Sequence, residues 1–232
     1  MERVRIVIAV LAVVCNLTFG LTAMAQDEPE YRMEIGGGLG MVTYLGDFNG
    51  SLLKGAQPIG AITAKFRMNP RMAIGATMSI GKLKGSSKDV ETWYPEYRDT
   101  AYTFNSQMAD FGLRYEYNFR AYGTGKEYHG AKRFAPFIAL GAGVSYANSD
   151  GTAIAANLML GAGVKYKIAD RLNLTAEWNM HFSGSDKLDG VEDPYGIRST
   201  GLFKNTDCYS VARLSLTYDI WAKCKICNND RD

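Results

Sequence analysis

Beyond its first residues the sequence lacks long hydrophobic runs, and it has almost no excess of charge. Its 26 Lys and Arg nearly balance its 24 Asp and Glu, for a formal net charge of +2. The composition therefore gives no sign of nucleic-acid binding. After residue 25 no stretch approaches the roughly 18 consecutive apolar residues of a membrane-spanning helix. Such a chain is either soluble or crosses a membrane as a β-barrel.

Proline is also scarce, with 6 residues, whereas glycine and tyrosine are frequent, with 25 and 14 residues. Proline interrupts the hydrogen-bond ladder of a sheet, and aromatic residues favour strands. This mixture suits strands with close backbone approaches better than helices. The length of 232 residues fits one all-β domain behind a leader segment.

The first 25 residues have the parts of a secretory signal peptide. Arg3 and Arg5 supply the positive start, Ile6–Cys15 is apolar, and Ala23-Met24-Ala25 places small residues where a signal peptidase cuts. We therefore expect residues 1–25 to be removed on export.

Apolar and polar residues alternate with a period of two in eight segments, which is the pattern of half-buried strands. In the clearest segment Phe111, Leu113 and Tyr115 alternate with Asp110 and Arg114. The eight predicted strands cover residues 31–41, 61–68, 72–81, 109–119, 134–146, 154–167, 172–182 and 212–220.

Two features favour a membrane barrel over a soluble one such as a lipocalin, which also has eight alternating strands. The first is that tight turns at residues 69–71 and 169–171 alternate with long connections. The long connections are residues 45–57, 83–101 and 184–206, and the connection 121–133 is a long exception on the tight-turn side. The second is that aromatic residues of the apolar face gather beside the tight turns, as an interfacial girdle would. They are Phe66, Tyr117, Phe119, Phe134, Tyr166 and Tyr218.

The polar face combines glycines with charges of both signs. An eight-stranded barrel has an interior just wide enough for side chains to fill, and buried charges must be paired. We therefore expect an all-β fold: an eight-stranded antiparallel transmembrane β-barrel over residues 26–221, with a filled polar lumen and no solute pore. The predicted lumenal charge network is Arg32, Glu34, Lys65, Arg67, Asp110, Arg114, Glu116, Lys165, Lys167, Glu177, Arg213 and Asp219.

The strongest catalytic candidate is His181-Phe182-Ser183 at the loop end of the seventh predicted strand. This His-x-Ser sequence resembles the active-site strand of PagL-type lipid A deacylases, in which His and Ser would form part of a nucleophilic site. An enzyme that acts on lipid needs access from the membrane face, whereas the alternation places His181 on the lumenal face. We expect a hydrogen-bonded histidine, no enzymatic activity and no cofactor or metal.

Three cysteines follow the predicted leader. Cys208 is separated from Cys224 and Cys227 by a strand of about 10 residues at ~3.3 Å each, which is too far for a disulfide. Cys224 and Cys227 form a C-x-x-C in the tail, residues 222–232. A local disulfide between them is the favoured interpretation for an exported protein, and a covalent link to a partner or a shared metal site stays open.

Several short patches resemble one family. Residues Gly38–Asn49, which read GLGMVTYLGDFN, resemble the opening strand and first loop of PorG-like outer-membrane proteins of the Bacteroidetes. Residues Ser185–Val191, which read SDKLDGV, are similar to their TDxLDDV loop, with Ser185 in place of Thr and Gly190 in place of the second Asp. The last strand at Asp207-Cys208-Tyr209 and the Cys-bearing tail are also similar.

The resemblance implies an outer-membrane component of the type IX secretion system, with both termini in the periplasm. Its implied partners are outer-membrane lipid and a periplasmic ring built by a PorK-like lipoprotein and a PorN-like protein. No nucleic acid or small-molecule substrate is expected. We predict that docking uses the periplasmic side, through Arg120, Lys126, Lys132, Arg133, Lys223 and Lys225.

Two alternative functions belong to other classes of outer-membrane protein. A lipid A-modifying enzyme would need His181 and Ser183. A structural or adhesive barrel would instead use loop residues such as Trp93, Tyr94 and Tyr97.

Overall fold

The computed structural model describes residues 29–45, 55–86, 103–124, 131–148, 152–184 and 207–222. The predicted signal peptide, residues 223–232 of the predicted tail and the adhesive candidates Trp93, Tyr94 and Tyr97 lie outside these ranges. Ala222, predicted as the first residue of the tail, is the last residue of the final strand. Within them, no helix is long and apolar enough to span a bilayer.

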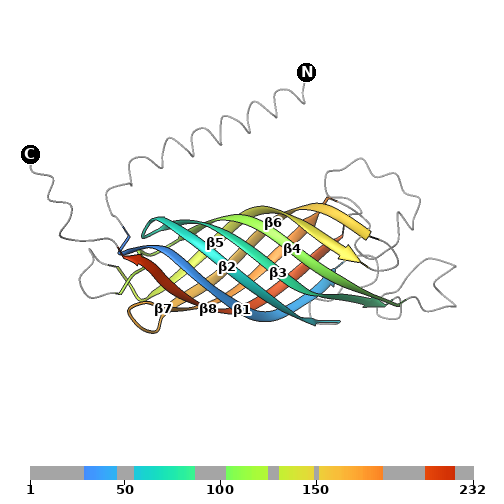
Figure 1. The fold of residues 1–232 in the computed structure, drawn as a ribbon, viewed down its shortest axis with the longest axis horizontal. Helices are drawn as coiled ribbons and strands as arrows, with labels where there is room; N and C mark the ends of the chain where they lie inside the picture. The colour runs from blue at the N-terminus through green and yellow to red at the C-terminus, as the bar shows by residue number, and fades with distance from the viewer. Residues whose placement is uncertain are drawn as a thin grey trace, which may run out of the picture.

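Eight antiparallel strands close into a barrel in the order of the sequence, each paired with the next and β8 paired with β1 (Figure 1). This confirms the predicted fold class. The strands are β1 (Tyr31–Leu45), β2 (Gln57–Asn69), β3 (Met72–Ser86), β4 (Thr103–Asn118), β5 (Phe134–Asn148), β6 (Thr152–Lys167), β7 (Leu172–Ser183) and β8 (Cys208–Ala222).

Several strands extend further at the loop end than the alternation predicts. Leu83, expected to begin a loop, lies inside β3 and is fully buried. The pattern reverses here, because the outward residues Lys82 and Lys84 are polar whereas the inward Leu83 is apolar. β3 and β4 stay paired as far as Ser86 and Thr103. The strand ends were missed because they carry no apolar outer face.

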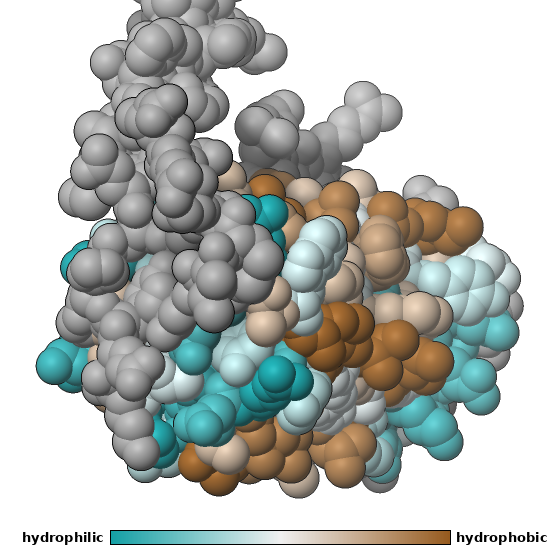
Figure 2. All heavy atoms as spheres, turned by 60° about the vertical axis from the view of Figure 1, so that its left-hand side comes forward, coloured by the Kyte–Doolittle hydropathy of each residue, from teal (hydrophilic) through white to brown (hydrophobic). Residues whose placement is uncertain are grey.

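The exterior of the barrel is apolar along its middle. Outward side chains are widely exposed, and Leu39 at 77% and Ile154 at 69% are extreme cases. Figure 2 shows hydrophobic residues gathered on the barrel wall and hydrophilic residues at the end that comes forward. Soluble monomers rarely expose a contiguous apolar patch above a few hundred Å². This surface therefore requires a lipid environment.

The pairing register places charges next to glycines inside the barrel. Lys65 is paired with Gly75, which in turn is paired with Arg114. A Cβ at Gly75 would lie 3.1 Å from Lys65 Cγ and 3.7 Å from Arg114 Cγ. The glycine therefore leaves room for two long cationic side chains in a narrow lumen.

The lipid-facing assignment predicts a depth-dependent cost for an added charge. Leu158→Arg, at an outward position in the middle of β6, should lower the free energy of unfolding by about 2–4 kcal/mol. The matched variant Asn148→Arg adds the same charge on the outward face of β5 at its loop end, and should cost about 0–1 kcal/mol. Urea titration of the protein in lipid vesicles measures both values. Equal costs at the two depths would contradict the membrane placement.

Candidate functional site

The lumen contains two layers of different chemistry. Towards the short-turn end, where β1 begins and β8 ends, it is filled by buried charged side chains. Towards the loop end, it is filled by a cluster of buried apolar and aromatic side chains that includes Val42, Tyr44, Leu83 and Phe104. The sequence analysis predicted the charged layer and missed the apolar one.

Glu34 lies at the centre of the charged layer and is completely buried. It accepts a hydrogen bond from Arg67 Nη2 at 2.7 Å and another from the Thr217 hydroxyl, and lies 3.8 Å from Lys65 Nζ. Arg67 also donates to Asp219 Oδ1 at 2.8 Å. One buried carboxylate thus compensates two cations from the neighbouring strand.

Two further carboxylates extend this network across the barrel. Glu177 Oε2 accepts a hydrogen bond from Arg114 Nη1 at 2.7 Å, and its Oε1 accepts one from Arg213 Nε at 2.7 Å. Glu116 accepts a hydrogen bond from Lys165 and lies 3.2 Å from Lys65 Nζ. Lys65 therefore connects Glu34 and Glu116, and the ion pairs form one connected network.

The structure buries nearly all charges that the alternation assigned to the lumen. Arg32 is only partly buried, because it lies near the start of β1 where the barrel opens to its rim. Asp110 is buried and accepts hydrogen bonds from neutral groups, with Tyr209 at 2.8 Å and Asn157 at 2.7 Å. The predicted lumenal charges that the structure buries are Glu34, Lys65, Arg67, Asp110, Arg114, Glu116, Lys165, Lys167, Glu177, Arg213 and Asp219.

Tyr122 covers the charged layer from the short-turn side. It comes from the connection between β4 and β5, is 4% exposed, and donates from its hydroxyl to Asn173 Oδ1 at 2.8 Å. Its ring centroid lies 5.4 Å from Arg67 Cζ and 5.6 Å from Lys167 Nζ. Burial raises the pKa of Tyr122, so the phenol stays neutral. The long connection that broke the pattern of tight turns thus supplies a cap for the lumen.

Backbone hydrogen bonds hold this connection against the rim. The Tyr122 N–H donates to Pro70 O at 3.0 Å, and the Lys132 N–H donates to Ala121 O at 2.7 Å. Arg133 Nε donates to Thr124 O at 2.9 Å. These hydrogen bonds join the connection to the neighbouring tight turn and also join its two described halves to each other.

The predicted docking residues fall on this rim or outside the described residues. Arg120 and Lys132 are exposed, and Arg133 is partly buried by its contact with the connection. Lys126, Lys223 and Lys225 lie outside the described ranges, as do the predicted disulfide partners Cys224 and Cys227. The structure therefore places an exposed basic pair beside the cap.

Phe137 is a second aromatic residue that the sequence analysis missed. It points into the lumen from β5 with 1% exposure, and its ring centroid lies 5.0 Å from Lys165 Nζ and 5.9 Å from Lys65 Nζ. The alternation that placed Ala135 and Ala139 inward also places Phe137 inward. Ring faces attract cations, so Phe137 and Tyr122 stabilise a layer whose ion pairs contain more cations than carboxylates.

The apolar layer closes the loop end. The rings of Tyr44 and Phe104 meet edge to face with centroids 5.0 Å apart, and the Tyr44 hydroxyl donates to Asp207 Oδ1 at 2.5 Å. Leu83 and Tyr44 are fully buried in this cluster. This cluster and Tyr122 therefore cover the charged layer from its two ends.

His181 and Ser183 lie in the lumen and not on the lipid face. His181 is 8% exposed and stacks on Tyr209 with ring centroids 4.4 Å apart, and Ser183 is fully buried. The buried Nδ1 of His181 has no hydrogen-bond partner among the described residues, so the expected hydrogen bond is not found at this atom. A lipid acyl chain on the barrel exterior has no access to either side chain. Among the described residues no group of His, Cys, Asp or Glu could hold a metal ion.

The connected ion pairs predict that losing Glu34 destabilises the barrel far more than losing an exposed partner. Glu34→Ala leaves Arg67 and Lys65 without their shared carboxylate, and should lower the free energy of unfolding by about 3–5 kcal/mol. Asp170→Ala is the control, because Asp170 is 77% exposed and lies 4.0 Å from Arg133 Nη2. It should cost less than about 1 kcal/mol. Urea titration of both variants in lipid vesicles measures these losses in the free energy of unfolding. Similar losses for the two variants would contradict a network that is stabilised by buried ion pairs.

The cap predicts different effects for the ring and the hydroxyl of Tyr122. Tyr122→Phe keeps the ring over the cations and loses one hydrogen bond, so it should cost about 0.5–1.5 kcal/mol. Tyr122→Ala also loses the ring and leaves a void, so it should cost about 3–5 kcal/mol. The same titration measures both. Equal losses would show that the ring does not stabilise the charged layer.

A family model for the outer membrane protein beta-barrel domain matches residues 11–198. No curated protein matches the sequence. Neisserial surface protein A has a similar solved structure, with 11% identity, coverage of 81% of this chain and 97% of that chain, and a TM-score of 0.53. This similarity shows the fold alone.

Other outer-membrane barrels match more weakly. OprG from Pseudomonas aeruginosa is 10% identical, with coverage of 85% of this chain and 99% of that chain and a TM-score of 0.49. The outer membrane enzyme PagL is 10% identical, with coverage of 81% of this chain and 99% of that chain and a TM-score of 0.37. So low a structural similarity gives no support for a role of His181 and Ser183. The family model matches most of the chain and the apolar exterior of the closed barrel agrees with it, so the protein belongs to the outer membrane protein beta-barrel domain family.

Proposed function

We propose that the protein is an outer-membrane component of the type IX protein secretion machine and docks a periplasmic ring complex through its short-turn rim and tail. The observation that carries this proposal is the filled lumen. Buried ion pairs, the Tyr122 cap and the apolar layer leave no space for a transported solute. A barrel of this kind acts through its surfaces.

The short-turn rim is the surface that best suits a docking role. In the described part of the connection between β4 and β5, backbone hydrogen bonds hold Tyr122 and Lys132 in place, and the exposed Arg120 lies two residues before Tyr122. Ordered groups lose less conformational entropy on binding than mobile ones. β8 ends at Ala222 at the same end of the barrel (Figure 1), and the tail with Lys223, Cys224, Lys225 and Cys227 follows it in the sequence.

The resemblance to PorG-like proteins supplies the identity of the partners. In this proposal both termini and the short-turn rim face the periplasm, and the ring consists of a PorK-like lipoprotein and a PorN-like protein. The basic rim and tail would bind acidic surfaces of the ring, and outer-membrane lipid surrounds the barrel wall.

The proposal predicts that neutralising the rim weakens ring binding without affecting the barrel. Arg120→Gln with Lys132→Gln should reduce the affinity for the ring about tenfold, which corresponds to about 1.4 kcal/mol. Deletion of residues 223–232 should reduce recovery of the ring further. Quantitative mass spectrometry of proteins that co-purify from native outer membranes measures recovery, and the gel mobility of the unboiled protein confirms folding.

A matched control changes net charge equally at the other end. Thr103→Glu with Asn148→Glu adds two negative charges at exposed positions of the loop end, and should leave ring recovery unchanged. If the rim variant and the tail deletion both recover the ring as well as the wild type does, the docking proposal is wrong. An equal loss in the loop-end control would show that net charge alone governs recovery.

A further inference from the structure

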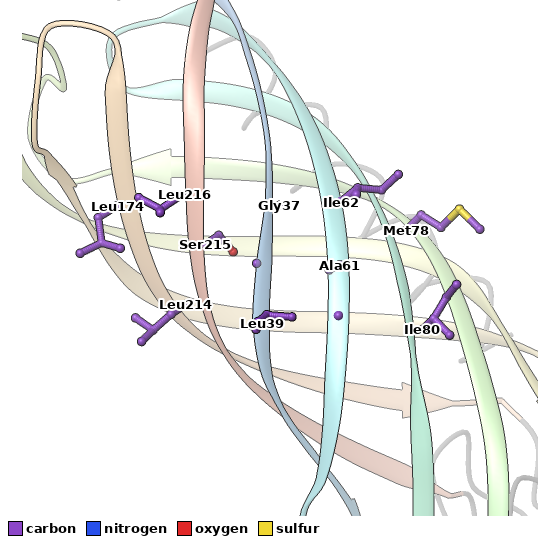
Figure 3. A pocket seen from close by; sticks show the side chains of 12 residues that line it. Gly37, Leu39, Ala61, Ile62, Met78, Ile80, Leu174, Leu214, Ser215 and Leu216 are labelled. Carbon is purple, nitrogen blue, oxygen red and sulfur yellow. The ribbon is translucent and has the colours of Figure 1, made fainter.

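The lipid-facing wall has a hollow over β1 and β2. It is a shallow hollow that is open to the surrounding lipid, with a volume of about 880 Å³. Figure 3 shows leucines of β7 and β8 on one side, aliphatic residues of β2 and β3 on the other, and Gly37 with Leu39 between them. The flanking side chains are Leu174, Leu214, Leu216, Ile62, Met78 and Ile80.

The hollow exists because glycines replace outward side chains on its floor. The inward Gly38 is required by packing, since a Cβ there would lie 2.6 Å from the carbonyl oxygen of Leu214. The outward Gly60 is different, because its added Cβ would meet only Leu39 Cδ2, at an ordinary contact distance of 3.7 Å. A side chain would fit at Gly60, so barrel packing does not explain the glycine there.

A cationic strip begins at the edge of this hollow. Along the outward face of β3, Met78 and Ile80 line the hollow, and Lys82 and Lys84 are the next two outward residues. Alternate residues of a strand are about 6.6–6.8 Å apart. The cross-strand partners of the two lysines are Gln107 and Asn105, which are exposed and carry no charge. Neither lysine therefore has a carboxylate opposite it in the sheet.

We propose that the hollow and the two lysines form one site for a lipid whose phosphate-bearing headgroup has a net negative charge. An acyl chain fills the space above Gly60, and the phosphate binds Lys82 and Lys84 at the loop-end surface of the membrane. The ammonium groups suit a phosphate, and Gln107 and Asn105 can donate further hydrogen bonds. The aliphatic lining matches the acyl chain, so a single lipid satisfies both parts.

Native mass spectrometry of the folded protein in detergent micelles tests this site. Phosphatidylglycerol and phosphatidylcholine with identical acyl chains are added in equal amounts, and the fraction of protein that retains each lipid is measured. The wild type should retain phosphatidylglycerol about tenfold better than phosphatidylcholine. Lys82→Gln with Lys84→Gln should abolish this preference, whereas Lys82→Arg with Lys84→Arg should preserve it.

The apolar part of the site has its own variant and control. Gly60→Leu fills the hollow and should reduce retention of both lipids several-fold. Ala162→Leu adds similar bulk at an exposed outward position of β6, away from the hollow, and should leave retention unchanged. Gel mobility of the unboiled protein checks the folding of each variant, and the lysine variants test the site even if Gly60→Leu does not fold.

The proposal is overturned if the wild type retains both lipids equally, or if the glutamine pair keeps the preference for phosphatidylglycerol. Equal retention by folded Gly60→Leu and Ala162→Leu would also overturn it, because the acyl chain would then not occupy the hollow. None of these outcomes bears on ring docking, which is measured on a different surface.

Discussion

The sharing of buried carboxylates among several cations is the constraint on which this barrel depends. Each ion has lost its hydration inside a lumen closed by the strands, so it is tolerated only while its partners stay in place. Lys65, between Glu34 and Glu116, joins charges that come from different strands. The pairing therefore acts across the barrel, and it fixes which residues of each strand must face inward.

The other lumenal features follow from this layer. Because its ion pairs contain more cations than carboxylates, the rings of Phe137 and Tyr122 lie against the lysines and Arg67. Tyr122 reaches the layer from the long connection on the short-turn side, four residues after the end of β4. The apolar cluster around Tyr44 and Phe104 covers the opposite end of the lumen. A barrel filled in this way leaves its rim and its outer wall as the surfaces available for function.

The sequence predicted the fold and most of the charged layer because a period of two assigns each strand residue to one face. Glu34 and Arg67 were found in this way, and so was the lumenal position of His181. Tyr122 could not be found, because the alternation says nothing about a connection that folds back into the barrel. Leu83 was missed because its outward neighbours are polar, so the pattern there resembles a loop. Arg32 is only partly buried, because the alternation of a strand does not show how near a residue lies to the rim of the barrel.

The central claim is that the lumen is closed by its own side chains, so the protein works through its surfaces. Conductance of the purified wild-type protein in planar lipid bilayers tests this claim most directly. The account predicts no stable open-channel steps after insertion, at any salt concentration that keeps the barrel folded. Reproducible porin-like steps that grow with salt concentration would contradict it, because they would require a continuous aqueous path through the charged layer.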